Sequence, residues 1–169
     1  MRKQARGGSR RSLPAMFCRI FGTLMLIILV LFCLPLTVPR MLGWHIYTVV
    51  SGSMEPSIPT GSLLYIRQAQ PQDMAEGDVI AYYGGTGSGA VITHRVVENR
   101  VVMGEFIIKG DANQAADINP VRYANFIGEV AHIIPEAGKA AAFFTSPGGK
   151  KLAACLVAAA VLLHVLASL

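Results

Sequence analysis

The chain has 169 residues, and 53% of them are hydrophobic, a larger share than an ordinary soluble domain of this size carries. The formal net charge is +5, but 6 of the 15 basic residues precede residue 20 and the other 9 are offset by 10 acidic residues. The main body therefore lacks the basic excess that phosphate binding needs, which argues against a nucleic-acid-binding protein.

A basic tail, residues 1–19, runs directly into an apolar segment, residues 20–38. The tail holds six cations and no acidic residue: Arg2, Lys3, Arg6, Arg10, Arg11 and Arg19. The apolar segment has 19 residues without a formal charge, close to the roughly 20 that a helix needs to cross a hydrocarbon core. Since basic residues flank membrane helices on the cytoplasmic side, we expect a cytoplasmic N-terminus and an extracytoplasmic main body.

A cleaved signal peptide is the alternative interpretation of residues 20–38. The apolar run is longer than the roughly 7–15 residues of a signal-peptide core. The end of this run, Pro35–Arg40, also contains no small-x-small cleavage site. A retained transmembrane helix is therefore the favoured prediction.

Residues 44–137 have a different residue pattern, in which short runs rich in β-branched residues alternate with turn residues. The runs that predict strands are 47–50, 63–66, 79–83, 90–93, 95–98, 101–102 with 106–109, and 126–130. Predicted turns include Glu98-Asn99-Arg100 and the glycine-rich segment 84–89, the expected tip of a hairpin. Strands at this spacing predict a mainly β domain, a small antiparallel barrel or sandwich.

Two aromatic residues, Trp44 and Tyr47, follow the first apolar segment closely. Because such side chains favour the headgroup zone of a bilayer, we expect the β domain to lie against the outer leaflet. Ser53 would then lie close to the membrane surface.

The C-terminal part of the chain predicts a linker, residues 138–151, and a second membrane helix, residues 152–169. The latter segment has 18 residues without a charge, interrupted only by His164 and Ser168. Its length is at the minimum for a membrane span.

Serine catalysis requires a hydroxyl, a base, an acid that orients the base, and donors for the oxyanion. His94 follows the predicted strand at 90–93 and is a candidate base. His132 lies in an apolar run that fits a core histidine equally well, His45 lies near the first apolar segment, and His164 lies in the second. The residue types alone do not choose among these histidines.

Four short motifs resemble those of signal peptidase I, in the order of that family. They are Ser51-Gly52-Ser53-Met54-Glu55-Pro56, Gly77-Asp78-Val79-Ile80, Ile92-Thr93-His94-Arg95-Val96, and Lys109-Gly110-Asp111-Ala112-Asn113 with Asp117 after it. The histidine motif resembles that of the endoplasmic-reticulum-type subfamily, which also occurs in archaea and some Gram-positive bacteria. Four motifs in family order behind a membrane anchor make chance a poor explanation.

The resemblance implies a role for each matched residue. Ser53 matches the nucleophile, and His94 occupies the position of the general base, where the ordinary bacterial branch has a lysine. The Ser51 hydroxyl and the Ser53 backbone N–H match the oxyanion hole. Asp117 matches the acid that orients the histidine, and Asp111 matches a nearby supporting acid. No metal and no cofactor are expected.

The sequence leaves open which aspartate contacts the histidine, with Asp117 favoured over Asp111. The acidic motif here reads Asp117-Ile118-Asn119-Pro120, whereas relatives often carry two adjacent acids. Gly110-Asp111 also fits a turn in which the carboxylate bonds local backbone.

The resemblance implies a signal peptidase fold and an endopeptidase of the cell membrane that removes signal peptides from secretory preproteins after small-x-small sites. The expected partners are these preproteins, the lipid bilayer and the secretion translocon, but no nucleic acid. One alternative is a membrane-tethered β domain that binds or assembles without catalysis. Another is a self-cleaving repressor-type peptidase, but those are cytoplasmic and use a lysine base.

Overall fold

The computed structural model describes residues 13–85 and 89–168. Most of the predicted basic tail, the centre of the predicted hairpin tip and Leu169 lie outside these residues. The described elements are α1 (Leu13–Met41), β1 (His45–Thr48), β2 (Leu63–Arg67), β3 (Val79–Tyr83), β4 (Val91–Arg100), β5 (Glu105–Lys109), β6 (Val121–Arg122), β7 (Phe126–Ile134), α2 (Ala137–Thr145) and α3 (Pro147–Leu166), with 3₁₀ turns at Pro71–Asp73 and Tyr123–Asn125. They divide into a helical unit, which comprises residues up to Leu34 and from Ser146 on, and a β unit, Pro35–Thr145.

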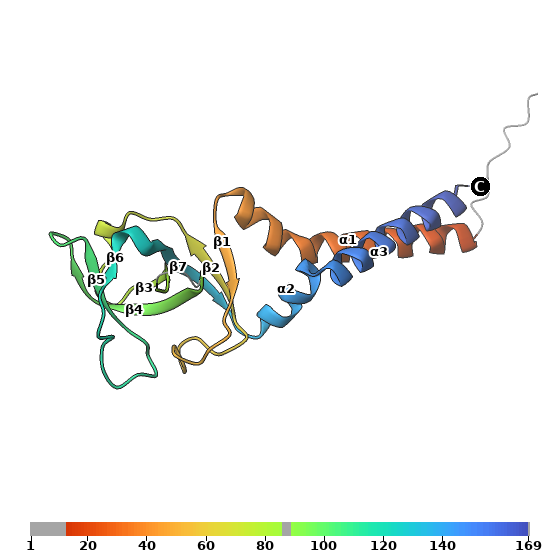
Figure 1. Cartoon of the computed structure of the whole chain (residues 1–169). Helices are drawn as coiled ribbons and strands as arrows, with labels where there is room; N and C mark the ends of the chain where they lie inside the picture. The colour runs from red at the N-terminus through yellow and green to blue at the C-terminus, as the bar shows by residue number, and fades with distance from the viewer. Residues whose placement is uncertain (1–12, 86–88, 169) are drawn as a thin grey trace, which may run out of the picture. The chain divides into compact units, whose positions relative to one another are not determined.

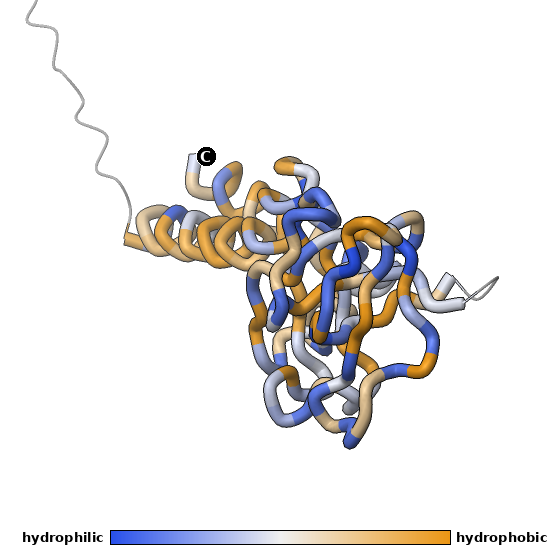
Figure 2. The backbone as a smooth tube through the Cα atoms, turned by 90° about the vertical axis from the view of Figure 1, so that its left-hand side faces the viewer, coloured by the Kyte–Doolittle hydropathy of each residue, from blue (hydrophilic) through white to orange (hydrophobic). Residues whose placement is uncertain are grey.

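The helical unit pairs α1 with α3 through small residues. Gly22 of α1 is buried against the ring of His164 and the carbonyl of Ala160, both on α3. His164 Nε2 lies 3.2 Å from Thr23 Oγ1, which adds a polar contact between the helices. Both helices are long and apolar enough to cross a membrane by length and composition, and Figure 2 shows long hydrophobic stretches along α1.

The residues predicted as a linker, 138–151, are mostly helical, because they form most of α2 and the first turn of α3. Alanine dominates α2, and alanine has the highest helix propensity. A new helix starts at Pro147 because Ser146 caps it: the Ser146 hydroxyl accepts a hydrogen bond from the Gly149 N–H at 3.1 Å.

The β unit is mainly β, as predicted, and contains one antiparallel sheet with the strand order β1-β2-β7-β3-β4-β5-β6. The sheet curls into a half-barrel, which agrees with the small antiparallel β architecture that the sequence predicts (Figure 1). The strands predicted separately at 90–93 and 95–98 are one long strand, β4, which pairs with β3 and with β5. Strand β6 has two residues, too few to show a period in the sequence.

The turn predicted at Glu98-Asn99-Arg100 is wrong, because these residues belong to β4. The Asn99 amide donates to the carbonyls of Pro71 and Met74 at 3.0 and 2.7 Å, so a polar residue fits inside the strand. The chain reverses at residues 101–104 instead, where Gly104 adopts a left-handed conformation with φ +67°. Val101 and Val102, predicted as a strand, lie exposed in this turn. The strand propensity of the two valines gave the wrong prediction, whereas Gly104 was the available turn signal, because a residue without a Cβ adopts this conformation easily.

Two of the apolar clusters among the described residues position the candidate site. The larger one joins β3, β4, β5 and β6 and contains Met74, Ile80, Tyr82, Val96, Phe106, Ile108 and Val121. The smaller one contains Met54, Ile58 and Leu64, with Val49, Val79 and Val130 packed against it. The smaller cluster attaches the loop after β1, which carries Ser53, to the sheet.

Candidate active site

Ser53 lies in the loop between β1 and β2, and its neighbours anchor that loop. The Met54 and Ile58 side chains are 1% and 0% exposed and pack on Leu64 of β2. The Ile58 N–H donates to the Met54 carbonyl at 2.8 Å, which closes a turn directly after Ser53. Ser53 itself is half-buried, whereas Ser51 is exposed at the start of the same turn. Apolar burial thus fixes the backbone of Ser53 while one side of the residue stays accessible.

His94 lies in the middle of β4, opposite Ile80 of β3, and is 7% exposed. Its Nδ1 lies 2.7 Å from Oδ2 of Asp117, in the loop that follows β5. The Asp117 N–H donates to the carbonyl of Ile108 at 2.9 Å, which returns this loop to the strand beside His94. Of the two candidate aspartates, Asp117 is therefore the one in contact with the imidazole.

Gly110 stands between the Ser53 loop and the histidine. A Cβ at this position would lie 2.6 Å from the Ser53 carbonyl oxygen and 3.1 Å from His94 Nε2. The Ala112 N–H donates to the same Ser53 carbonyl at 3.0 Å. The turn after β5 therefore joins the two candidate residues, and the imidazole nitrogen that faces it is the one opposite the Asp117 contact.

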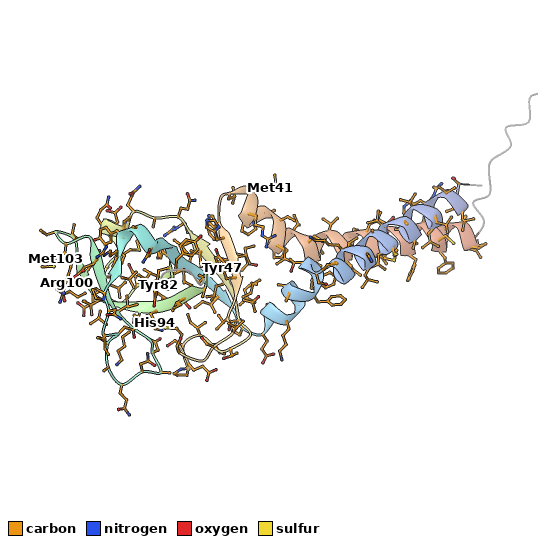
Figure 3. All side chains as sticks on the ribbon, in the orientation of Figure 1. Met41, Tyr47, Tyr82, His94, Arg100 and Met103 are labelled. Atoms are coloured by element: carbon orange, nitrogen blue, oxygen red, sulfur yellow. The ribbon has the colours of Figure 1, made fainter. Side chains whose placement is uncertain are left out.

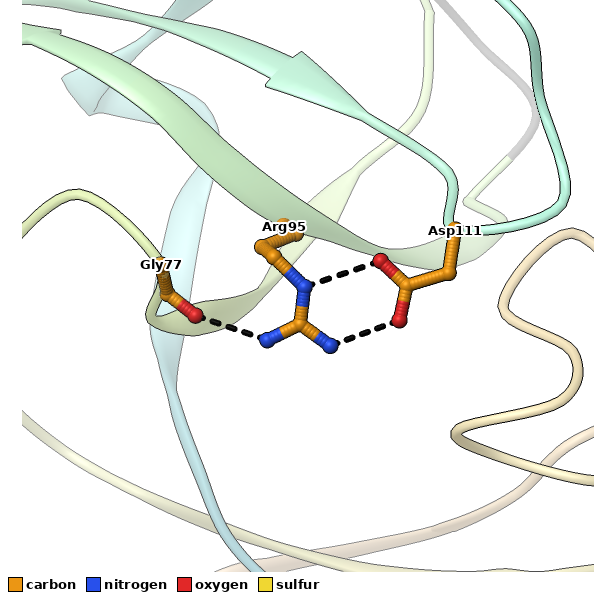
Figure 4. A network of polar contacts seen from close by, with 3 residues as sticks. All are labelled: Gly77, Arg95 and Asp111. Carbon is orange, nitrogen blue, oxygen red and sulfur yellow. Dashed lines mark hydrogen bonds and ion pairs between the residues drawn. The ribbon is translucent and has the colours of Figure 1, made fainter.

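Asp111 is held by Arg95 rather than by the histidine (Figure 4). Arg95 Nε and Nη2 donate to Asp111 Oδ1 and Oδ2 at 2.8 and 2.6 Å, and Arg95 Nη1 donates to the Gly77 carbonyl at 2.7 Å. The Arg95 hydrogen bonds, with a further one from Ser57, hold the pKa of Asp111 below its ordinary value. The same hydrogen bond raises the pKa of Arg95. Through the ion pair with Asp111 and the hydrogen bond to Gly77, Arg95 links three of the four sequence motifs, which is a structural role.

Sequence reasoning missed Tyr82, a buried residue of β3 that lies beside His94 (Figure 3). Its hydroxyl is 3.5 Å from His94 Nδ1, and the two rings meet edge to face with centroids 6.2 Å apart. Burial, and secondarily the charge of Asp117, raises the pKa of Tyr82. The available signal was its position two residues after Ile80, which places both side chains on the buried face of the strand.

The other histidines lie in different settings. His132 stacks on Trp44, His45 lies against Tyr47, and His164 contacts Thr23. Within residues 13–85 and 89–168, no group of three or more His, Cys, Asp or Glu side chains is arranged to hold a metal ion. An imidazole held by a carboxylate on one ring nitrogen, as His94 is by Asp117, can accept or donate a proton through the other nitrogen.

No family model matches the chain. The chain is 35% identical over 91 residues to "Signal peptidase I W" of Bacillus subtilis (strain 168), which covers 52% of this chain and 46% of that protein. The match thus extends over about half the length of this curated relative. This similarity supports the resemblance to signal peptidase I that the four motifs indicate.

Proposed function

We propose that the chain is a membrane-anchored serine endopeptidase of the signal peptidase I kind, with the Ser/His/Asp chemistry of the endoplasmic-reticulum-type subfamily. The observation that carries the proposal is the position of His94. One ring nitrogen lies 2.7 Å from Asp117, and the other lies against the glycine that contacts the Ser53 backbone. This is the order of groups that an activated serine requires.

In this mechanism His94 acts through both ring nitrogens. Asp117 accepts the Nδ1–H and so leaves the lone pair on Nε2, which takes the proton of the Ser53 hydroxyl as its oxygen attacks the scissile carbonyl. The imidazolium that forms is stabilised by the Asp117 carboxylate and then protonates the leaving amine. Water hydrolyses the acyl-enzyme at Ser53 by the same base.

The tetrahedral intermediate needs donors for its oxyanion. We assign this role to the Ser53 backbone N–H and the Ser51 hydroxyl. Each such donor contributes about 3 kcal/mol to transition-state stabilisation in serine peptidases. Ser51 is exposed at the start of the turn, so a substrate can reach it.

The substrates follow from the proposed membrane location. With α1 and α3 as membrane helices and the N-terminus in the cytoplasm, the β unit would face secretory precursors whose apolar segment is still in the bilayer. A small-x-small site would emerge beside the enzyme, and the extended substrate would lie along a strand edge. The translocon that delivers such precursors is the expected partner complex.

The test is processing of a secretory precursor by the full chain in membranes. We expect loss of cleavage in Ser53→Ala and His94→Ala and strong loss in Asp117→Ala. Ser168→Ala and Asp73→Ala are the matched controls for the serine and the aspartate. Ser168 is exposed just after α3, and Asp73 is exposed at the end of a 3₁₀ turn, so both variants should leave cleavage unchanged. Normal processing by Ser53→Ala would refute the proposal.

A further inference from the structure

The β unit carries an apolar groove of about 450 Å³, and none of Ser53, His94 and Asp117 lines it. Its walls come from the last turns of α1, the residues that follow it, β2 and the end of β7. They include Pro35, Pro39, Leu42, Trp44, Tyr65 and Ile133. None of the residues that line the groove is acidic.

A proline builds one wall of this groove. Pro39 has no N–H, so the carbonyl of Pro35, four residues earlier, lacks its helical donor. The Tyr65 hydroxyl of β2 donates to that carbonyl at 3.1 Å. The Trp44 N–H donates to the Pro39 carbonyl at 2.9 Å, and the Trp44 ring stacks on His132 with centroids 5.8 Å apart. The groove is therefore formed by specific bonds between α1 and the sheet.

A second cavity, of about 440 Å³, shares Trp44 with the groove and is more polar. It is lined by Arg40, Gly43, His45 and Gln68 together with Ile46 and Tyr47. No acidic residue lines it, and Arg40 forms no ion pair with any residue that the structure describes. A cation whose surroundings contain no carboxylate favours an anionic ligand.

We infer that the groove and this cavity together bind one phospholipid. An acyl chain would occupy the groove, and the phosphate diester would lie at Arg40, with the Gln68 amide as a further donor. Trp44 lines both regions, and tryptophan side chains favour the headgroup zone of a bilayer. The ligand fits the site because it joins an apolar chain to an anion. The site likewise joins an apolar wall to Arg40, which has no ion-pair partner among the described residues.

The inference rests on the proposed membrane anchoring but not on the proposed peptidase chemistry. The groove is lined by the last turns of α1, a helix long and apolar enough to cross a membrane. An apolar peptide is the competing occupant, and it carries no group that needs Arg40. The two occupants therefore differ in their dependence on one side chain.

The chain offers a direct reporter, because Trp44 is its single tryptophan. The purified full chain in a non-ionic detergent is titrated with phosphatidylglycerol brominated on its acyl chains, and quenching of Trp44 fluorescence is measured. We expect saturable quenching at low lipid mole fraction. Brominated diacylglycerol, which lacks the phosphate, should quench only in proportion to its mole fraction.

Variants assign the phosphate contact. Arg40→Gln should raise the half-saturating lipid fraction about tenfold or more, the scale of a lost charge-assisted contact. Arg40→Lys, which keeps the charge, should retain most of the binding. If Arg40→Gln does not fold, the comparison of phosphatidylglycerol with diacylglycerol on the wild-type chain still tests the phosphate contact. Arg122→Gln, an exposed arginine of β6 at the opposite edge of the sheet, is the matched control and should bind as the wild type does.

Three results would overturn the inference: quenching without saturation, equal quenching by diacylglycerol, or wild-type binding by Arg40→Gln. Saturable quenching by an apolar bromophenylalanine peptide but not by the phospholipid would assign the groove to peptides instead. The Ser53→Ala chain should bind lipid normally. Lipid binding without precursor cleavage would therefore count against the proposed function alone, and cleavage without lipid binding against this inference alone.

Discussion

Asp117 Oδ2 lies 2.7 Å from His94 Nδ1, although Asp111 is nearer to the histidine in the sequence. Asp111 faces Arg95 instead and forms two hydrogen bonds with its guanidinium. The two aspartates therefore have separable roles, and substitutions should separate catalysis from stability.

Asp117→Asn should lower kcat by about 10³- to 10⁴-fold, because the amide favours the wrong imidazole tautomer while preserving the shape of the side chain. Thermal stability should change little, since asparagine keeps the size of the side chain and one acceptor oxygen. Precursor cleavage and a thermal melt on the same preparation measure both effects. The control is Asp73→Asn, and a wild-type kcat in Asp117→Asn would remove Asp117 from the mechanism.

Asp111→Asn should destabilise the β unit by about 1–3 kcal/mol at neutral pH, since it breaks a two-bond contact to a charged partner. The Asp111 carboxylate has a folded-state pKa below its usual 3.8, so its stabilising contribution is present above that value. This contribution is lost as pH falls through the lowered folded-state pKa. Melting temperatures of the two proteins should therefore converge below about pH 4. A difference independent of pH would argue against the ion pair as its cause.

Gly110→Ala should lower kcat by two orders of magnitude or more, because an added Cβ would displace the Ser53 backbone or the His94 ring. The control is Gly148→Ala in α3, where an added Cβ meets its nearest heavy atom at 3.8 Å. Steady-state kinetics on both variants check the difference. Unchanged kcat in Gly110→Ala would mean that the contact between these segments does not support catalysis.

Tyr82→Phe should lower kcat by roughly tenfold with little change in KM, because the hydroxyl beside Nδ1 helps to orient the imidazole. A shifted pH profile of kcat would distinguish this positioning role from a general loss of packing. Tyr83→Phe, at an exposed neighbour, is the matched control. Identical pH profiles for wild type and Tyr82→Phe would contradict the role.

Gly22→Leu should destabilise the pair of helices by about 1–3 kcal/mol, the usual cost of overpacking. Even a Cβ would lie 2.8 Å from His164 Nδ1 and 3.3 Å from the Ala160 carbonyl. Val30→Leu, at an exposed position of α1, should have no such effect. Cross-linking between cysteines introduced on α1 and α3 would report the separation directly.

Much of the β unit could be predicted from local patterns. Most predicted strands coincide with observed ones because β-branched runs favour extended backbone wherever they fold. The exceptions depend on distant partners: Asn99 lies in a strand because it bonds to the 3₁₀ turn, and β6 exists only where it meets β5. The helix at 137–145 was not predicted, because Pro135 and Pro147 flank its short alanine-rich run and favour a loop.

The sequence by itself determined that the chain has two apolar segments around a β-rich body and that Ser53 and His94 stand in motifs resembling those of one peptidase family. Apolar segments and strands can be predicted from the sequence because each depends on residues that are close together along the chain. Only the tertiary structure decided that Asp117 contacts the imidazole while Asp111 pairs with Arg95, that Gly110 must lack a side chain, and that Tyr82 belongs beside His94. These relationships arise where β3, β4 and the loop after β5 converge, and no local pattern encodes which side chains meet across a sheet.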